Sequence, residues 1–200
     1  MSIKILGGMA KGRIINLPKN SSIRPTSVLL RRKFFDSNQN WLDKHFIDLC
    51  AGSGAMAIEA WSRGAKSTIL VEFNRKNFNA LLKTCNEFEN SYKERSEGSL
   101  TCVNDDCQSY IKKFLDKYNQ LSETDKENTY IFLDPPYSKH KIYESVINEI
   151  LNSAPKFLGH LLIESDEKQG FTLDRCLEMG LTKDKVITHG DSYLLFSKIS

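Results

Sequence analysis

Short apolar runs that suit strands alternate with amphipathic stretches that suit helices from residue 45 onward. The apolar runs are rich in β-branched and aromatic residues. They lie at residues 45–49, 67–72, 100–103, 130–134 and 159–164, and helices are predicted at about residues 55–63, 74–88, 107–118 and 140–152. Strands that alternate with helices in this way predict an α/β fold, built on a parallel sheet with helices on both faces.

The two ends of the chain carry a different pattern. Residues 3–6 and 13–17 are short apolar runs separated by glycines, which predicts a β-hairpin. After the break at "RPTS", Thr26 or Ser27 can cap a helix that runs to about residue 42. The apolar runs near the C-terminus predict a closing antiparallel hairpin, at residues 186–188 and 193–196. Two polar stretches, at residues 89–99 and 119–128, are predicted surface loops.

Composition suits one globular domain with a small extension. The chain has 200 residues, of which 40% are hydrophobic and 26% are charged. We therefore predict a hairpin-and-helix extension at residues 1–42 and a larger domain at residues 43–200. The first residues lack the apolar region of a signal peptide, and no apolar run approaches the ~20 residues that span a bilayer. The five cysteines include no C-x-x-C pair, so a reducing cytoplasm is the expected compartment.

Positive charge is concentrated at the start of the sequence. Residues 1–40 hold eight Lys and Arg against one acid, a net charge of +7, whereas the other 160 residues hold twenty against twenty-four, a net charge of −4. Such a basic arm is typical of a protein that binds a polyanion, although a solvated arm without a partner has the same composition. The candidate contacts to RNA phosphates are Lys11, Arg13, Arg24 and Arg31.

The sequence "FIDLCAGSGAMAIEA" reads as a strand, a glycine turn and the start of a helix. Gly52 and Gly54 lack a Cβ atom, so a ligand can approach the backbone at the positive end of the helix. Glu72 follows eighteen residues after Gly54, at the end of the next strand, where a carboxylate can accept both hydroxyls of a ribose. The pattern predicts an adenosine-type cofactor, and a nicotinamide dinucleotide also satisfies it.

Two further carboxylates bear on the choice of cofactor. Asp48 stands just before the glycine turn, where it suits the ammonium group of an amino-acid cofactor better than a pyrophosphate. This favours S-adenosylmethionine. Asp106 follows the third predicted strand of the larger domain and can accept a hydrogen bond from an adenine amino group; it can equally serve as a helix N-cap.

The stretch "IFLDPPY" places an acid and an aromatic residue directly after a predicted buried strand. In open α/β sheets ligands bind beyond the carboxyl ends of the strands, and two prolines hold this loop in place. Asp134 and the carbonyl of Pro135 can accept the two N–H groups of a conjugated amine, so that its lone pair points at a methyl donor, while Tyr137 stacks on the base. The four histidines show no spacing typical of metal ligands, and no metal site is predicted.

Six motifs of this sequence resemble, in order, those of the RsmD family of bacterial methyltransferases, which modify the N2 amine of one guanine in small-subunit ribosomal RNA. They are "GGMAKGR", "RPTS", "DLCAGSGAMAIEAWSRGA", "LVEFNR", "IFLDPPY" and "LLIES". The resemblance covers residues 5 to about 196. It implies a Rossmann-like class I methyltransferase fold with a mostly parallel seven-stranded sheet. It also implies an N-terminal extension that meets ribosomal RNA in an assembled or assembling small subunit.

The resemblance also implies roles for the candidate residues. S-adenosylmethionine would bind at Gly52, Gly54, Glu72 and Asp106, and the target amine would be held by Asp134, Pro135 and Tyr137. After "RPTS" the family tends to continue with Asp-Arg-x-Arg-Glu, whereas residues 28–32 of this chain keep only the second arginine. Three other functions stay open: methylation of an adenine amine or a glutamine amide, a non-catalytic RNA-binding assembly factor, and a nicotinamide oxidoreductase.

Overall fold

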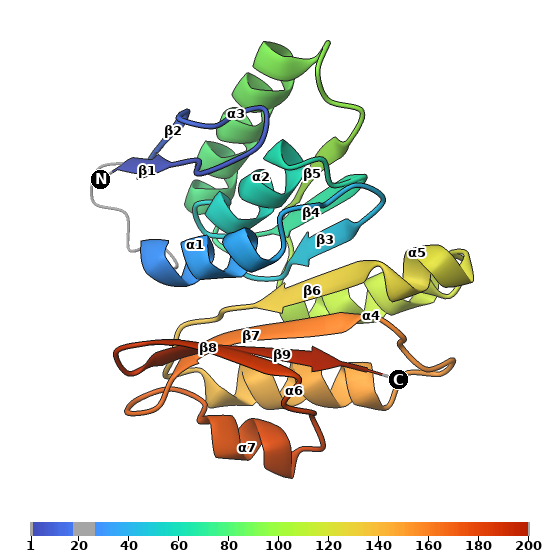
Figure 1. Cartoon of the computed structure of the whole chain (residues 1–200). Coiled ribbons are helices and arrows are strands. Elements are labelled where there is room, and N and C mark those ends of the chain that lie inside the picture. Colours follow the sequence, from blue (N-terminus) through green and yellow to red (C-terminus); the bar gives the residue numbers. More distant parts are fainter. Residues whose placement is uncertain (1, 18–26, 200) are drawn as a thin grey trace.

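A computed structural model of the chain describes residues 2–17 and 27–199. Its main sheet has seven strands in the order β5-β4-β3-β6-β7-β9-β8 (Figure 1). These strands are β3 (His45–Asp48), β4 (Ser67–Val71), β5 (Ser99–Val103), β6 (Thr129–Leu133), β7 (His160–Asp166), β8 (Lys185–His189) and β9 (Ser192–Lys198), and a separate hairpin pairs β1 (Ser2–Lys4) with β2 (Ile14–Asn16). β3 to β7 run parallel, and β9 lies antiparallel to both β7 and β8. The predicted α/β fold with a mostly parallel sheet is confirmed.

Helices cover both faces of this sheet (Figure 1). They are α1 (Val28–Ser37), α2 (Ala55–Ser62), α3 (Arg75–Tyr92), α4 (Cys107–Tyr118), α5 (Glu123–Glu127), α6 (His140–Leu151) and α7 (Leu173–Glu178). Side chains of α1, α2 and α3 belong to the hydrophobic core on one face, and side chains of α4, α6 and α7 belong to the core on the other. In β3, Phe46 enters the first core and Ile47 the second. Burial on both faces explains why the strands are continuous apolar runs. Among the helices of the described residues, none is both long and apolar enough to cross a bilayer.

The turn of the N-terminal hairpin packs against the end of α2. Ser62 accepts the N–H of Met9 on its carbonyl oxygen at 2.7 Å, while its hydroxyl accepts the N–H of Ala10 at 2.9 Å and donates to the carbonyl of Gly7 at 2.7 Å. Gly8 has a φ of +72°, and a Cβ atom there would lie 1.9 Å from the Ser62 carbonyl oxygen. The hairpin therefore shares the first core with α2, and the division of the chain at residue 42 stays a prediction.

A buried carboxylate on α2 joins the hairpin to α1. Glu59 is fully buried, and its Oε2 accepts the N–H of Leu6 at 2.7 Å and lies 3.6 Å from Nη1 of Arg31. Its Oε1 accepts a hydrogen bond from Nε of Arg63 at 2.9 Å. Arg31 also donates to the carbonyl of Lys4 at 2.7 Å. Burial lowers the pKa of the Arg31 guanidinium, and the nearby Glu59 carboxylate acts in the opposite direction. We call Glu59, Arg31 and Arg63 the Glu59 cluster.

The helix predicted to reach residue 42 is shorter than expected. α1 ends at Ser37, and the side-chain amide of Asn38 donates to the carbonyl of Phe34 at 2.9 Å. Trp41 then packs into the first core from the following loop, not from the helix. Ser27 stands at the N-cap position, but its side chain makes no capping hydrogen bond. The other candidate cap, Thr26, lies outside the described residues.

The prediction of a surface loop at residues 119–128 is wrong, because that stretch contains α5. The Ser122 hydroxyl caps α5 by accepting the N–H of Asp125 at 3.1 Å. Asp125 then reaches the sheet, where its Oδ1 lies 3.0 Å from Nε2 of His45 and 2.7 Å from Nζ of Lys66. These two contacts, in that order, lower the pKa of the Asp125 carboxyl. None of the residues of α5 is buried, so polar contacts and not apolar packing hold this helix beside β3 and β4.

Candidate active site

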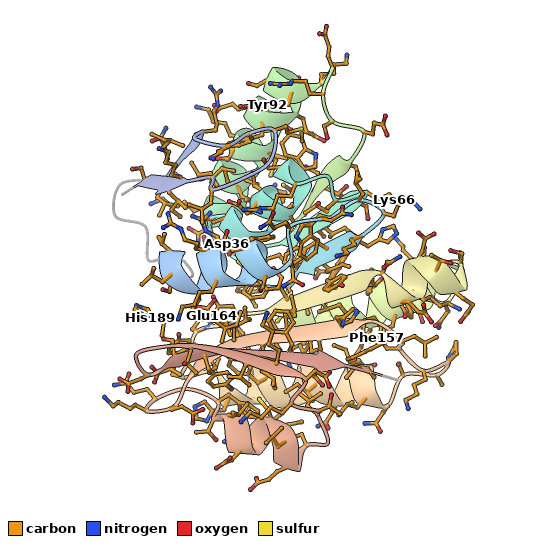
Figure 2. The ribbon with its side chains drawn as sticks, in the orientation of Figure 1. Asp36, Lys66, Tyr92, Phe157, Glu164 and His189 are labelled. Carbon is orange, nitrogen blue, oxygen red and sulfur yellow. The ribbon has the colours of Figure 1, made fainter. Side chains whose placement is uncertain are left out.

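Acidic side chains gather at the carboxyl ends of four neighbouring parallel strands. Asp48 is the last residue of β3, Glu72 directly follows β4, Asp134 directly follows β6, and Glu164 lies near the end of β7. Figure 2 shows Glu164 on the side of β7 that faces α1. The structure thus brings together three carboxylates that the sequence predicted and one, from the motif "LLIES", to which it assigned no role. Ligands of open α/β sheets bind at this edge.

Asp48 is buried among the other carboxylates. Burial raises the pKa of its carboxyl well above the usual range, and the charges of Asp134 and Glu72 raise it further. The N–H of Cys50 donates to Asp48 Oδ1 at 3.3 Å and opposes this shift. Negative groups held this close to one another form a site that favours a cation. The arrangement therefore suits a ligand that carries positive charge.

The glycine turn is hydrogen-bonded to β6 and β4, the two strands that flank β3. Leu49 donates its N–H to the carbonyl of Phe132 in β6 at 3.0 Å, and Ala51 donates to Val71 in β4 at 2.8 Å. Gly54 has a φ of +74°, and a Cβ atom there would lie 2.6 Å from Cδ1 of Leu81. Gly54 is thus required by its positive φ and by the packing of α3 on the turn. Substitution of Gly54 by valine would therefore perturb the fold before it reports on cofactor binding.

Glu72 joins the glycine turn to the start of α3. Its Oε2 accepts the N–H of Gly52 at 3.0 Å, and its Oε1 accepts the N–H of Asn74 at 2.8 Å. The side chain of Asn74 in turn caps α3 by accepting the N–H groups of residues 76 and 77. A carboxylate oxygen has a second acceptor position, so these bonds leave capacity for ribose hydroxyls. The predicted ribose contact is compatible with this geometry and stays a prediction.

Phe73 was missed by the sequence prediction. Its side chain is 77% exposed, although it directly follows Glu72 at the edge of the site. The side-chain amide of Asn104 donates to the carbonyl of Glu72 at 2.8 Å and to that of Phe73 at 3.1 Å, and it fixes this piece of backbone. An exposed aromatic ring on a fixed backbone can stack on a flat ligand. The signal in the sequence was an apolar residue just after the strand-ending acid in "LVEFNR".

Asp106 caps α4. Its Oδ1 accepts the N–H of Ser109 at 2.9 Å, and its hydrogen bonds with Ser109 lower the pKa of its carboxyl. The helix-cap interpretation of this residue is thus correct. The predicted contact with an adenine amino group stays a prediction, because a carboxylate that caps a helix retains further acceptor capacity.

The Asp-Pro-Pro-Tyr loop is held from two sides. Pro135 is buried, and its carbonyl accepts a hydrogen bond from the hydroxyl of Tyr143 in α6 at 3.2 Å. Tyr137 is half-buried, and its hydroxyl lies 3.2 Å from Oγ of Ser192, the first residue of β9. Asp134 comes directly before this anchored segment and is also half-buried. The loop therefore presents an acid, a carbonyl and an aromatic ring from a fixed backbone beside the other carboxylates.

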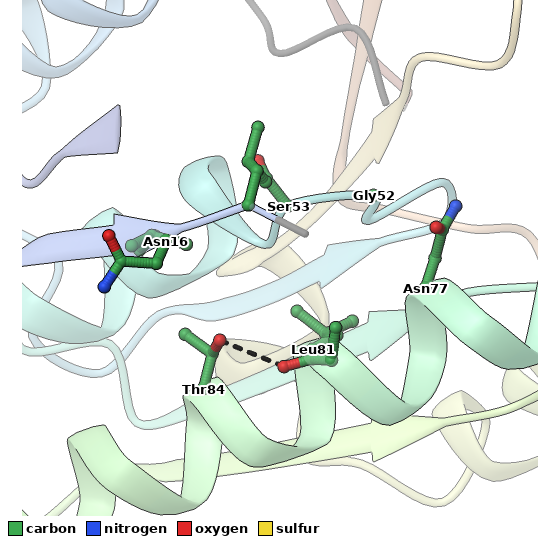
Figure 3. A pocket seen from close by; sticks show the side chains of 9 residues that line it. Asn16, Gly52, Ser53, Asn77, Leu81 and Thr84 are labelled. Atoms are coloured by element: carbon green, nitrogen blue, oxygen red, sulfur yellow. Dashed lines mark hydrogen bonds between the residues drawn. The ribbon is translucent and has the colours of Figure 1, made fainter. Parts of the chain in front are cut away.

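A small pocket lies between the glycine turn, the hairpin and α3 (Figure 3). Its polar lining residues are Asn16 of β2, Ser53 of the turn, and Asn77 and Thr84 of α3. Of the predicted cofactor residues, Gly52 is the one that lines it. The glycine turn therefore separates the pocket from the carboxylate site. The hairpin lines the pocket opposite α3 and so lies next to the turn.

The candidate RNA contacts fall into three groups. Lys11 and Arg13 are exposed on the hairpin, and Arg13 also reaches Oγ of Ser91 at 3.3 Å. Arg24 lies outside the described residues. The prediction for Arg31 is wrong, because its side chain is 1% exposed and is held inside the Glu59 cluster. A buried guanidinium with protein partners cannot lie along an RNA phosphate.

Residues 3–196 match the model of the protein family described as conserved hypothetical protein 95. Several curated relatives carry the name ribosomal RNA small subunit methyltransferase D. The Escherichia coli K12 relative is 28% identical over 149 residues, which is 72% of this chain and 65% of that protein. The relative from Buchnera aphidicola of Acyrthosiphon pisum is 29% identical over 198 residues, which is 96% of this chain and 92% of that protein.

A solved structure described as a putative methyltransferase from Escherichia coli has the same fold. It superposes with a TM-score of 0.69 at 22% sequence identity, and the match covers 99% of this chain and 98% of that one. Its likeness therefore extends over the sheet, the helices and the N-terminal hairpin.

Proposed function

The chain belongs to the conserved hypothetical protein 95 family, and from this membership and the geometry of the site we propose that it transfers the methyl group of S-adenosylmethionine to the N2 amine of a guanine in small-subunit ribosomal RNA. The names of the curated relatives support the rRNA substrate. The observation that carries the proposal is the convergence of Asp48, Glu72 and Asp134 beside the glycine turn and the Asp-Pro-Pro-Tyr loop. Action on a small subunit or its assembly intermediate, in the cytoplasm, is part of this proposal.

S-adenosylmethionine supplies an electrophilic methyl group on a positively charged sulfur, and the donor set of this site fits it. Glu72 would hold the ribose hydroxyls, and Asp48 would face the ammonium group. Asp106 would accept from the adenine amino group, and Phe73 would stack on the adenine. Repulsion from Asp134 and Glu72 adds to the effect of burial on the pKa of Asp48. A positively charged ligand in the site would offset this repulsion. A nicotinamide dinucleotide would instead bring its pyrophosphate towards these carboxylates, which disfavours that alternative.

The target amine of guanine is a weak nucleophile, because its lone pair is delocalised into the ring. Asp134 and the carbonyl of Pro135 would accept its two N–H groups and leave the lone pair directed at the methyl group. Tyr137 would stack on the base and fix its plane. Formation of the C–N bond would break the bond between the methyl carbon and the sulfur, which would leave as a neutral thioether. The nitrogen would gain positive charge, and the Asp134 carboxylate would accept the proton that it releases.

The transfer itself is tested with purified protein, tritiated S-adenosylmethionine and small subunits from cells that lack the gene for this chain. We expect label in the ribosomal RNA at a stoichiometry near one methyl group per subunit. Naked RNA assayed in parallel tests whether the particle is required. Label in ribosomal protein instead of RNA would favour methylation of a glutamine amide.

Cofactor affinity should fall when the carboxylate at the end of β4 is removed. In Glu72→Ala, both ribose hydroxyls lose a charged acceptor worth about 1.5–3 kcal/mol, which corresponds to a rise in Kd of roughly 10-fold to 150-fold. The matched control is Glu87→Ala, which removes an exposed glutamate from α3 that pairs only loosely with Lys83 at 4.0 Å. Titration calorimetry with S-adenosylmethionine gives both constants. Equal constants for Glu72→Ala and the wild type would remove Glu72 from the cofactor site.

The exposed basic residues of the hairpin should contribute to RNA affinity by neutralising phosphates. We expect Lys11→Ala with Arg13→Ala to reduce the slope of log affinity against log salt by up to roughly 0.7–0.9 for each phosphate that is no longer neutralised. The control pair is Lys112→Ala with Lys117→Ala, two exposed lysines on α4, which covers the other face of the sheet. Titration of a labelled rRNA fragment at several salt concentrations measures the slopes. Parallel lines for the hairpin variant and the wild type would show that these two residues touch no phosphate.

A further inference from the structure

The hydroxyl of Tyr143 joins two strand ends at the border of the site. Tyr143 lies in α6 and is 0% exposed. Its hydroxyl donates to the carbonyl of Pro135, in the loop after β6, at 3.2 Å and to the carbonyl of Glu164, in β7, at 2.9 Å. A phenol has one proton, so the two carbonyls share a single donor. The Asp-Pro-Pro-Tyr loop is thereby attached to the strand next to it.

The position of this hydroxyl is fixed by the packing of its ring. Tyr143 stacks on Phe171 with ring centroids 5.1 Å apart and an angle of 8° between the planes. The backbone of Phe171 is itself held, because its carbonyl accepts a hydrogen bond from the hydroxyl of Tyr193. Burial raises the pKa of the Tyr143 phenol, and the nearby charge of Asp134 raises it further, so the donor proton is retained.

We propose that Tyr143 is a positioning residue for methyl transfer, whose hydroxyl sets the direction of the Pro135 carbonyl; this rests on the proposed function. The pyrrolidine ring of Pro135 fixes its φ but not its ψ, and ψ decides where its own carbonyl points. Pro136 restricts that ψ only to a range of about 40°. The hydrogen bond from Tyr143 selects one direction within this range.

The bond from Tyr143 leaves the Pro135 carbonyl able to accept the target amine. A carbonyl oxygen has two lone pairs, and Tyr143 occupies one of them from the protein interior. The other can accept one N–H of the amine while Asp134 accepts the second. Because misplacement of reacting groups by ~1 Å can cost about 100-fold in rate, loss of the Tyr143 hydroxyl should affect turnover more than cofactor binding.

The test compares Tyr143→Phe with Tyr118→Phe. Both variants remove the hydroxyl of a buried tyrosine, and both rings lie in the same core. The hydroxyl of Tyr118 accepts the N–H of Leu158 at 2.9 Å and donates to the carbonyl of Lys126 at 3.2 Å. Both partners come before the strands β7 and β6 begin, at the opposite edge of the sheet from the loop at residues 134–137. In Tyr143→Phe we expect kcat to fall by about 10-fold to 100-fold, with KM for S-adenosylmethionine within about 2-fold of wild type. In Tyr118→Phe, kcat should stay within about 2-fold of wild type even if the melting temperature falls equally in the two variants.

A second measurement does not depend on activity. Amide hydrogen exchange at residues 137–139 should be faster in Tyr143→Phe than in wild type, and unchanged in Tyr118→Phe. Unchanged exchange or unchanged kcat in Tyr143→Phe would overturn the proposal, as would an equal loss of kcat in both variants. If the wild type transfers no methyl group to RNA, the proposed function fails, and exchange alone then decides whether Tyr143 anchors the loop.

Discussion

Asp134→Ala is expected to reduce methyl transfer by about 100-fold to 1000-fold, the range for loss of one preorganised polar group that acts on the reacting atoms. The amine would lose the acceptor that orients its lone pair and takes up its proton, and the Pro135 carbonyl alone cannot do both. Single-turnover transfer to small subunits at saturating cofactor measures the chemical step. The loss should appear in the rate and not in the affinity for RNA.

Affinity for S-adenosylmethionine should change little in the same variant. Asp134 is proposed to bind the target amine and not the cofactor. Its removal leaves in place Glu72, Asp48 and Asp106, the carboxylates proposed to hold S-adenosylmethionine. Asp36 is an exposed acid on α1 (Figure 2) and serves as the control. Asp36→Ala should match the wild type in both the transfer rate and the affinity for S-adenosylmethionine. Wild-type rates for Asp134→Ala would exclude this residue from the mechanism.

Glu59→Ala should cause the largest loss of stability. Removal of one member of a buried ion pair leaves the other charge uncompensated and costs about 3–5 kcal/mol. In this chain the Arg31 side chain is 1% exposed, and it would lose the Glu59 carboxylate as its partner. The N–H of Leu6 would lose its hydrogen-bond acceptor. For a protein of this size the melting temperature should fall by roughly 6–20 °C. Urea unfolding monitored by circular dichroism gives the free energy directly.

A second variant separates the charge effect from the loss of packing. Replacement of a buried ion pair by apolar residues of similar volume is often neutral. Glu59→Leu combined with Arg31→Met should therefore recover a large part of the stability that Glu59→Ala loses. A loss below about 1 kcal/mol in Glu59→Ala would show that the Glu59 cluster does not hold the hairpin and α1 together.

Most of the sheet could be predicted because its strands are buried on both faces. The predicted bounds of β3, β4 and β6 lie within one residue of the observed ones, since continuous apolar runs such as Tyr130–Leu133 end abruptly at an acid or a glycine. α5 could not be predicted in this way. It buries no residue and is held by Asp125, whose partners lie about sixty and eighty residues away in the sequence, so no local pattern marks it.

The candidate site was partly predictable for the same reason. Asp48 ends a strand, and Glu72 and Asp134 directly follow one, so the sequence alone places all three at one edge of the sheet. Arg31 was misassigned because charge counts do not distinguish an exposed arginine from one that faces a buried glutamate on another helix. Tyr143 was missed because it looks like any apolar position of α6; only the three-dimensional structure brings its hydroxyl to Pro135.

The central claim is that the methyl group goes to N2 of guanine in small-subunit ribosomal RNA. The most direct test is the nucleoside composition of that RNA after reaction with the purified wild-type protein and S-adenosylmethionine, measured by mass spectrometry against the Asp134→Ala variant. We predict one N2-methylguanosine per RNA molecule with the wild type and a rate at least about 100-fold lower with the variant. N6-methyladenosine in its place, or equal N2-methylguanosine with both proteins, would contradict the account.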